Sequence, residues 1–303
     1  MMNEFGKIIT AMVTPLNENL NLDLKVIEPL VKHLEETGTE TLVLAGTTGE
    51  GPTIEEREKL ELLSEVYKHK NKLTKIIMNV GTNNTKETVR NAIKWSENEM
   101  VDGIMVVCPY YNKPSQMGLY KHFESVNDAV SKPIMAYHIP GRTNVTMSAE
   151  TMVKVANLSN IVMLKDAEGD LEKLQDVIKQ TKGKWDVYSG DDPALFNYLE
   201  IGSKGIVSVA SHVIGNAINS LIEAYENKGY DSAKDYQEFI KEVSEQLFPS
   251  FSPNPVPIKY VLSKMGLMTE KVRLPLTELA GSEKEQILNV LHQQQIFKQI
   301  NHS

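Results

Sequence analysis

Eight short apolar runs, rich in β-branched residues, recur along the chain at intervals that leave room for a helix between them. Segments with helical spacing lie between the runs, as in Ile27, Leu30, Val31 and Leu34. Strand and helix therefore alternate, and continuous apolar runs are typical of parallel strands that are buried on both faces. The runs are Ile8 to Val13, Thr41 to Ala45, Lys75 to Val80, Gly103 to Cys108, Pro133 to His138, Ile161 to Lys165, Asp186 to Ser189 and Gly205 to Ala210.

Eight strand–helix units over about 225 residues match the size of a (β/α)8 barrel. A doubly wound sheet is the alternative α/β fold. It is disfavoured because no Gly-x-Gly-x-x-Gly fingerprint follows the first run and because a count of eight suits closure. Beyond residue 229 the strands stop and helical patterns take over. We therefore predict a (β/α)8 TIM barrel with the active site over residues 1–228, and an appended C-terminal helical region over residues 229–303.

Two local signals refine this outline. Thr53 followed by Glu56 predicts a capping box at the start of the second helix of the barrel. Four prolines near residue 253 predict a stiff connection between two helices of the C-terminal region. These prolines are Pro249, Pro253, Pro255 and Pro257.

Composition narrows the class of ligand. The 303 residues carry a net charge of -8 and no lysine/arginine block, so the average field repels nucleic acid and anionic membranes. Small polar metabolites are the expected partners. The run Ile8 to Val13 is too brief for a secretory signal, and no apolar stretch approaches membrane-spanning length. A single cysteine, Cys108, cannot form an intramolecular disulfide, which fits a reducing cytoplasm. Because Cys108 lies in an apolar run, we expect its side chain to be a small buried hydrophobe.

The most informative residue for chemistry is Lys165, which follows four apolar residues of a predicted buried strand. A low-dielectric interior disfavours the charged form of a lysine, so its pKa falls and the neutral amine can attack a carbonyl to form a Schiff base. The alternative is a lysine that opens a surface loop and reaches water with its ammonium group.

Polar residues follow several other predicted strands, and in a (β/α)8 barrel the carboxyl ends of the strands form the active site. Gly46-Thr-Thr-Gly-Glu-Gly51 offers hydroxyls and turn amides that could bind an anion, although a plain tight turn explains it as well. Tyr111 and Tyr137 could relay protons, or could be packed aromatics. Arg142 has the planar fork that suits a carboxylate, or it could be an exposed surface arginine.

A metal centre is a rival interpretation. His138, His212, Asp191 and Asp192 fall near predicted strand ends and could bind a divalent metal, as in barrel hydrolases. No His-x-His pair or other close ligand spacing supports this interpretation, and we expect no metal and no cofactor.

Taken together, these residues resemble the dihydrodipicolinate synthase family, the pyruvate-dependent Schiff-base aldolases that include N-acetylneuraminate lyase. The likeness runs nearly end to end through ordered motifs. They are Gly46-Thr-Thr-Gly-Glu50, Pro109-Tyr-Tyr-Asn-Lys-Pro-Ser-Gln116, Tyr137 through Gly141-Arg142-Thr143, Lys165-Asp-Ala167, Ser189-Gly-Asp-Asp192, Gly205-Ile-Val-Ser-Val209, Asn254-Pro-Val-Pro-Ile-Lys259 and Arg273-Leu-Pro-Leu276.

The resemblance implies a lyase that condenses pyruvate with aspartate semialdehyde, on the route to diaminopimelate and lysine. Lys165 would form the imine with pyruvate, and Thr48 with its turn amides would hold the pyruvate carboxylate. The proton relay would consist of Tyr137, Thr47 and Tyr111.

The resemblance also implies an assembly. In the family the tyrosine equivalent to Tyr111 enters the site of the neighbouring subunit, which implies a dimer at least and usually a homotetramer built as a dimer of dimers. Arg142 would bind the carboxylate of aspartate semialdehyde. Gly190 and Val207 would contribute backbone groups near the imine and the carboxylate.

The chain departs from the family pattern at two places. His138 stands where the family often has asparagine. Glu56 and Lys59 stand where lysine-sensitive relatives carry histidines, and a cation at Lys59 would repel an incoming lysine ammonium. We therefore expect weak or absent inhibition by lysine. Other residues of that region keep matching types, namely Asn83, Glu87 and Tyr110.

Two alternative functions share most of these residues. A sister aldolase would use the same imine with a sugar acid or another aldehyde, but Arg142 and the double tyrosine favour the synthase. A non-catalytic barrel that binds a keto acid is disfavoured because the residues of the imine chemistry are all present, namely Lys165, Tyr137, Tyr111 and Thr47.

Overall fold

Eight strands form a closed parallel barrel in which each strand neighbours the next in chain order. The computed structural model describes residues 5–293. Each strand lies within one of the predicted apolar runs or extends one residue beyond it, which confirms the (β/α)8 barrel and excludes the doubly wound sheet. The strands are β1 (Ile8–Ala11), β2 (Thr41–Leu44), β3 (Lys75–Asn79), β4 (Gly103–Val107), β5 (Ile134–His138), β6 (Ile161–Asp166), β7 (Asp186–Ser189) and β8 (Gly205–Ser208).

Helices alternate with the strands and then continue alone to the end of the described chain. None of the described helices is both long and apolar enough to cross a membrane. The helices are α1 (Ile27–Glu36), α2 (Glu56–His69), α3 (Thr85–Ser96), α4 (Gln116–Ala129), α5 (Pro140–Thr143), α6 (Ala149–Ala156), α7 (Leu171–Thr181), α8 (Leu195–Glu200), α9 (Ser211–Glu226), α10 (Tyr230–Leu247), α11 (Val256–Lys264) and α12 (Gly281–Gln293).

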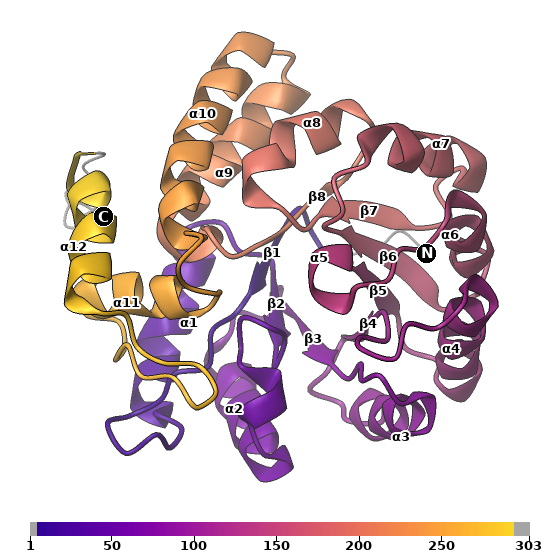
Figure 1. Ribbon diagram of the computed structural model, residues 1–303, viewed down its shortest axis with the longest axis horizontal. Coiled ribbons are helices and arrows are strands. Elements are labelled where there is room, and N and C mark those ends of the chain that lie inside the picture. The colour runs from indigo at the N-terminus through magenta and orange to yellow at the C-terminus, as the bar shows by residue number, and fades with distance from the viewer. Residues whose placement is uncertain (1–4, 294–303) are drawn as a thin grey trace. The chain divides into compact units, whose positions relative to one another are not determined.

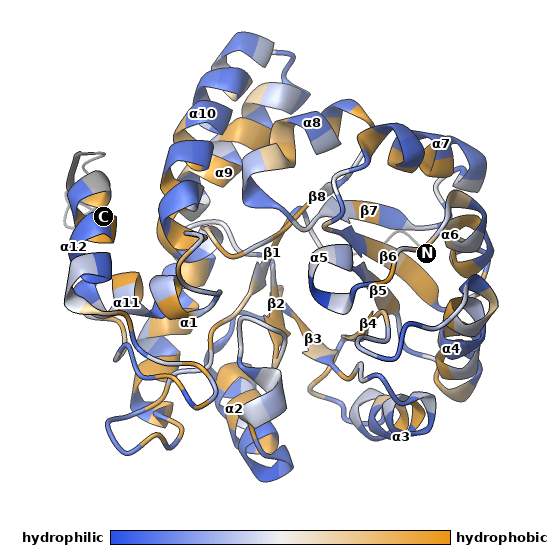
Figure 2. Cartoon of the chain, in the orientation of Figure 1, coloured by the Kyte–Doolittle hydropathy of each residue, from blue (hydrophilic) through white to orange (hydrophobic). Residues whose placement is uncertain are grey.

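The chain divides into two compact units, and the first combines its start, up to Ile9, with Lys75–Val207. Strands β3 to β8 pair in parallel, each with the next. Helices α3, α4, α6 and α7 lie on one side of these strands (Figure 1). Each of these helices carries both hydrophilic and hydrophobic residues (Figure 2), as expected of helices that cover a sheet on one face and meet water on the other.

The second unit comprises Thr10–Thr74 and the chain from Ser208 onward. It includes α1, α2 and the late helices, among which α10 packs along α9 (Figure 1). Ala233, Ile240 and Val243 of α10 are buried, as their helical spacing predicts. The helical nature of the region after residue 229 is therefore confirmed, whereas a domain boundary at residue 228 stays a prediction.

Helix α2 starts differently from the prediction. The capping box pairs Glu55 with Glu58, and the Glu58 carboxylate accepts a hydrogen bond from the Glu55 N–H at 2.9 Å. Thr53 instead ends a 3-10 turn, Gly51–Thr53, and its hydroxyl donates to the Glu50 carbonyl at 3.1 Å. The prediction of a Thr53–Glu56 box was wrong because Pro52 favours this extra turn, which delays the start of the helix.

Candidate active site

Tyr137 and Lys165 are direct neighbours on strands β5 and β6. The next pair along the same strands is His138 and Asp166. Because successive residues of a strand face opposite sides of a sheet, Tyr137 and Lys165 share one face while His138 and Asp166 share the other. All four residues are buried. The two strands therefore build two separate polar pairs, back to back.

The amine of Lys165 is buried at the end of β6, with 6% of the residue exposed. Its Nζ atom lies 4.4 Å from the centroid of the Tyr137 ring. Burial lowers the pKa of Lys165 from 10.5 to about 8; the carboxylate of Asp192 opposes this shift and the guanidinium of Arg142 adds to it. The interpretation of Lys165 as an exposed loop lysine is therefore wrong, and a substantial fraction of the amine is neutral near physiological pH.

Gly190, which follows β7, leaves space for the Lys165 side chain. A Cβ atom at this position would lie 3.1 Å from Cε of Lys165 and 2.9 Å from the carbonyl oxygen of Asp166. The Gly190 N–H donates to that same oxygen at 2.6 Å. Only a residue without a side chain fits here undisturbed, which is a local reason for glycine beside the amine. Val207, on β8, is buried.

Acidic residues follow Gly190. Asp192 is 2% exposed, and its negative charge is felt at Lys165. Burial and the charge of Asp192 raise the pKa of Asp191. Neither aspartate was assigned a role in the imine chemistry from the sequence, where both were considered only as metal ligands.

Arg142 lies on the short helix α5, which directly follows β5, and its side chain is exposed. Asn144 ends this helix with a left-handed backbone conformation, φ 57°. The exposed guanidinium is available to a ligand, and its charge already influences the pKa of Lys165. Arg142 and Lys165 therefore belong to one electrostatic environment.

Tyr111 is 87% exposed and has a positive φ of 73°. Lys113 also has a positive φ, 47°. Such conformations are uncommon for residues other than glycine. The alternative of a packed aromatic at Tyr111 is therefore wrong, whereas Tyr137 is 5% exposed and packs in the core.

Thr47 and Thr48 belong to the second unit, in the turn after β2. Thr48 is buried, and its hydroxyl oxygen accepts a hydrogen bond from the Asn254 amide at 3.0 Å. Gly51 cannot carry a side chain, since a Cβ atom would lie 2.1 Å from the Ala45 carbonyl oxygen. The turn is therefore closely packed and braced from a distant part of the chain.

A buried ion pair braces the same turn. Nζ of Lys259 on α11 lies 2.5 Å from Oε1 of Glu50, and the two side chains are 0% and 1% exposed. The other oxygen of Glu50 accepts a hydrogen bond from the N–H of Arg273 at 2.9 Å. The guanidinium of Arg273 in turn binds the Glu58 carboxylate through two nitrogens, at 2.5 and 2.7 Å.

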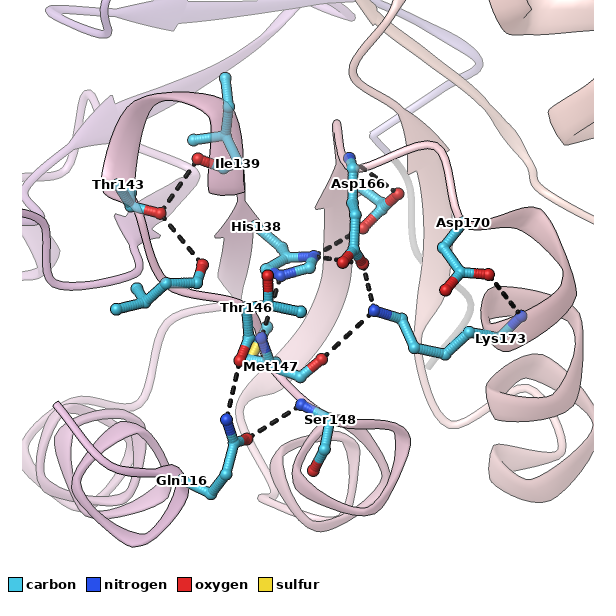
Figure 3. Close-up of polar contacts among 12 residues, drawn as sticks. Gln116, His138, Ile139, Thr143, Thr146, Met147, Ser148, Asp166, Asp170 and Lys173 are labelled. Atoms are coloured by element: carbon cyan, nitrogen blue, oxygen red, sulfur yellow. Dashed lines mark hydrogen bonds and ion pairs between the residues drawn. The ribbon is translucent and has the colours of Figure 1, made fainter. Parts of the chain in front are cut away.

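His138 and Asp166 form the second polar pair (Figure 3). Nδ1 of His138 lies 2.8 Å from Oδ1 of Asp166. Nε2 of His138 accepts a hydrogen bond from the N–H of Met147 at 3.1 Å, so we assign the proton of the neutral ring to Nδ1. Burial alone would raise the pKa of Asp166, but hydrogen bonds from His138 and from the Tyr198 hydroxyl, at 2.7 Å, hold it below its usual value.

His138, Asp166 and Glu168 are close enough together to hold a metal ion. Their existing contacts do not favour it. Nδ1 and Nε2 of His138 are both engaged, and Glu168 is paired with the ammonium group of Lys173. A metal could bind Nδ1 only by displacing the proton that this nitrogen donates to Asp166. Hydrogen bonds and the ion pair with Lys173 thus already occupy the atoms that would bind a metal ion.

Known proteins resemble this chain along nearly its whole length. A model of the dihydrodipicolinate synthetase family matches residues 4–294. The chain belongs to this family. A relative named 4-hydroxy-tetrahydrodipicolinate synthase 2, from Halalkalibacterium halodurans, is 42% identical over 290 residues, which are 96% of this chain and 98% of that protein.

Other relatives also match this chain over nearly its whole length. The 4-hydroxy-tetrahydrodipicolinate synthase of Oceanobacillus iheyensis is 39% identical over 95% of this chain and 96% of that protein. The crystal structure of a dihydrodipicolinate synthase from Bacillus anthracis superposes with a TM-score of 0.92 at 39% identity, covering 96% of this chain and 99% of that one.

Three residues of this family member contact the turn after β2 without having been assigned a role from the sequence. Asn254, Lys259 and Arg273 occur in motifs that resemble the family, yet nothing local shows that they hold Thr48 and Glu50. One signal was available, since Lys259 falls in a largely apolar stretch and therefore needs a buried partner.

Proposed function

We propose that this chain catalyses the condensation of pyruvate with L-aspartate 4-semialdehyde to give 4-hydroxy-tetrahydrodipicolinate, a lyase reaction that leads to diaminopimelate and lysine. Relatives of this length and identity carry the name of that synthase. The observation that carries the proposal is the buried amine of Lys165, whose pKa is lowered to about 8, beside the ring of Tyr137. A neutral amine in a low-dielectric site is the group that imine chemistry needs.

The first half of the reaction activates pyruvate. The neutral Nζ of Lys165 attacks the keto carbon, a C–N bond forms, and the keto oxygen leaves as water. The imine then loses a proton from its methyl group and becomes an enamine. Thr48 and the amides of its turn would hold the pyruvate carboxylate, and backbone groups of Gly190 and Val207 would lie near the imine.

The second half joins the two substrates. The nucleophilic carbon of the enamine attacks the aldehyde carbon, and the aldehyde oxygen takes up a proton. The amine of the former aldehyde then attacks the imine carbon, which closes the ring and releases Lys165. Arg142 would bind the carboxylate of the aldehyde substrate, because its exposed guanidinium can donate two parallel hydrogen bonds to a planar carboxylate. The chemistry uses no cofactor.

Protons would move through Tyr137, Thr47 and Tyr111. A phenol both donates and accepts hydrogen bonds, so a chain of hydroxyls can carry a proton between solvent and the reacting atoms. Tyr137 suits the inner end of this relay because it lies beside the Lys165 amine. A Tyr137→Phe variant, which keeps the ring and removes the hydroxyl, is therefore expected to lower kcat.

The active assembly would be a homotetramer built as a dimer of dimers, and at least a dimer. The 87% exposure of Tyr111 supports this, because an aromatic ring presented to solvent on a strained loop is suited to entering a partner's site. Sedimentation at micromolar concentration would distinguish a tetramer, a dimer and a monomer.

We place the enzyme in the cytoplasm, where the free thiol of Cys108 would remain reduced.

The deciding experiment compares two substrate pairs. The purified protein is assayed with pyruvate and aspartate semialdehyde, coupled to a reductase that consumes the cyclic product, and in parallel for cleavage of N-acetylneuraminate. Turnover with aspartate semialdehyde alone supports the proposal. Turnover of the sugar acid alone would indicate a sister aldolase, and binding of pyruvate without turnover in either assay would indicate a keto-acid-binding barrel.

A further inference from the structure

Met147 is held through both polar groups of its backbone. Its N–H donates to Nε2 of His138 at 3.1 Å, and its carbonyl oxygen accepts from Nζ of Lys173 at 3.4 Å (Figure 3). Both Met147 and His138 are 0% exposed. A buried N–H that lost its acceptor would have no water to replace it, so the bond to His138 strongly favours this backbone position.

The peptide groups on either side of Met147 are held as well. Gln116, the first residue of α4, donates to the Thr146 carbonyl at 2.7 Å and accepts from the Ser148 N–H at 2.9 Å (Figure 3). Side chains from α4, β5 and α7 therefore converge on three consecutive residues. This is the point where the chain returns from the end of β5 to the start of α6.

The segment between these anchors, residues 139–148, is short and carries Arg142. It begins at the end of β5, directly after His138, and contains the four-residue helix α5. The Thr143 hydroxyl donates to the carbonyls of Ile139 and Val145, which links the helix to both halves of the segment. Fixing Met147 therefore restricts where α5 and the guanidinium of Arg142 can lie.

We propose that His138 is a positioning residue, which holds segment 139–148, and with it Arg142, in the conformation that receives the carboxylate of the aldehyde substrate. This inference rests on the proposed function, in which Arg142 binds that carboxylate. His138 faces away from Lys165 and Tyr137, so its contribution concerns the second substrate, and it affects the imine-forming amine only through the charge of Arg142.

The two ring nitrogens of His138 make separable contributions. Nδ1 donates a hydrogen bond to the Asp166 carboxylate, and Nε2 accepts a hydrogen bond from the Met147 N–H. An asparagine places a polar atom at the position of Nδ1 but is too short to reach Met147. A glutamine places its oxygen near the position of Nε2 and can still accept that N–H. His138→Asn and His138→Gln therefore separate the two contacts.

The kinetic test measures KM and kcat for both substrates in the wild type and in these variants. We expect His138→Asn to raise the KM for aspartate semialdehyde roughly tenfold, with kcat changed less than about twofold, since misplacing a binding group weakens its ligand. His138→Gln should restore a KM near that of the wild type. Borohydride trapping of the pyruvate imine, measured at pH 9 so that a change in the pKa of Lys165 has little effect, should be equal in all three proteins.

A matched control removes a different buried histidine. His122 on α4 is 2% exposed, and its Nδ1 atom hydrogen-bonds the Thr85 hydroxyl, outside segment 139–148. His122→Asn should lower stability without changing the KM for the aldehyde. Hydrogen exchange of the peptide spanning residues 139–148 provides a readout independent of activity, and exchange there should accelerate in His138→Asn but not in His138→Gln or His122→Asn.

Arg142→Ala distinguishes failure of the inference from failure of the proposed function. If Arg142→Ala raises the KM for the aldehyde and His138→Asn changes neither that KM nor exchange, the inference is wrong and the role of Arg142 stands. If Arg142→Ala leaves the KM unchanged, that role is wrong, and so is the substrate-binding part of this inference. When both single variants raise KM, the double variant should match Arg142→Ala, because the effect of His138 passes through Arg142.

Discussion

The Nζ atom of Lys165 lies 4.4 Å above the ring of Tyr137, its direct neighbour on the adjacent strand. Both residues are buried, so the amine lies in a low-dielectric environment beside a phenol ring. Desolvation is therefore the main cause of the lowered pKa of Lys165, and it makes the amine nucleophilic.

The rate of imine formation should depend on pH through this amine. With a pKa of about 8 in place of 10.5, about one in ten molecules carries a neutral amine at pH 7, against about three in ten thousand for an ordinary lysine. The reactive form increases as pH rises through the pKa. We predict that kcat/KM for pyruvate increases with pH and levels off above about pH 8; a profile that is flat from pH 6 to pH 9 would contradict this.

Two charges should move that profile in opposite directions. The Asp192 carboxylate raises the pKa of Lys165 and the Arg142 guanidinium lowers it. Asp192→Asn should therefore shift the rising limb to lower pH, and Arg142→Ala should shift it to higher pH. The limb is measured from single-turnover trapping with pyruvate alone, which does not require the second substrate. Shifts of the same sign in both variants would show that the electrostatic account is wrong.

The buried pair of Lys259 and Glu50 should be essential for stability. Lys259→Met leaves the Glu50 carboxylate buried without its cation, and breaking such a pair typically costs about 3–5 kcal/mol. We expect a loss of that size in the free energy of unfolding measured by urea titration at fixed protein concentration. The control is Lys32→Met, which removes the cation of the exposed pair with Glu28 and should leave the titration unchanged. Equal midpoints for both variants would refute the prediction.

Lysine should inhibit this enzyme weakly or not at all. By the family resemblance, Lys59 would place a cation where lysine-sensitive relatives carry a histidine, and like charges repel at short range. Glu87, a residue of matching type, already has a cationic neighbour in Arg90 at 3.3 Å. The measurement is the initial rate at saturating pyruvate over increasing concentrations of L-lysine. An inhibition constant in the sub-millimolar range would overturn the expectation.

Much of the barrel could be predicted because its strands are short, apolar and buried on both faces, and this pattern is local. Lys165 stood out for the same reason, as a charged residue that continues an apolar run. The start of α2 was predicted wrongly because Thr53 and Glu56 match a capping box, whereas the turn that contains Pro52 lets Glu55 and Glu58 form it instead.

Contacts between residues far apart in the chain could not be predicted in this way. Thr48 and Asn254 are 206 positions apart, and only the fold brings them within hydrogen-bond distance. The position of Met147 also depends on His138, nine residues earlier, whose ring could equally have faced the substrate. Local patterns singled out the candidate nucleophile, but the residues that support the site emerged only from the folded chain.

We propose that one amine, that of Lys165, forms the imine with pyruvate, and chemical reduction traps that bond directly. The protein is treated with borohydride in the presence of pyruvate, digested, and mapped by mass spectrometry. We expect a reduced pyruvate adduct on the peptide that contains Lys165, and no adduct in Lys165→Ala. Labelling of a different lysine, or undiminished turnover by Lys165→Ala, would contradict this proposal.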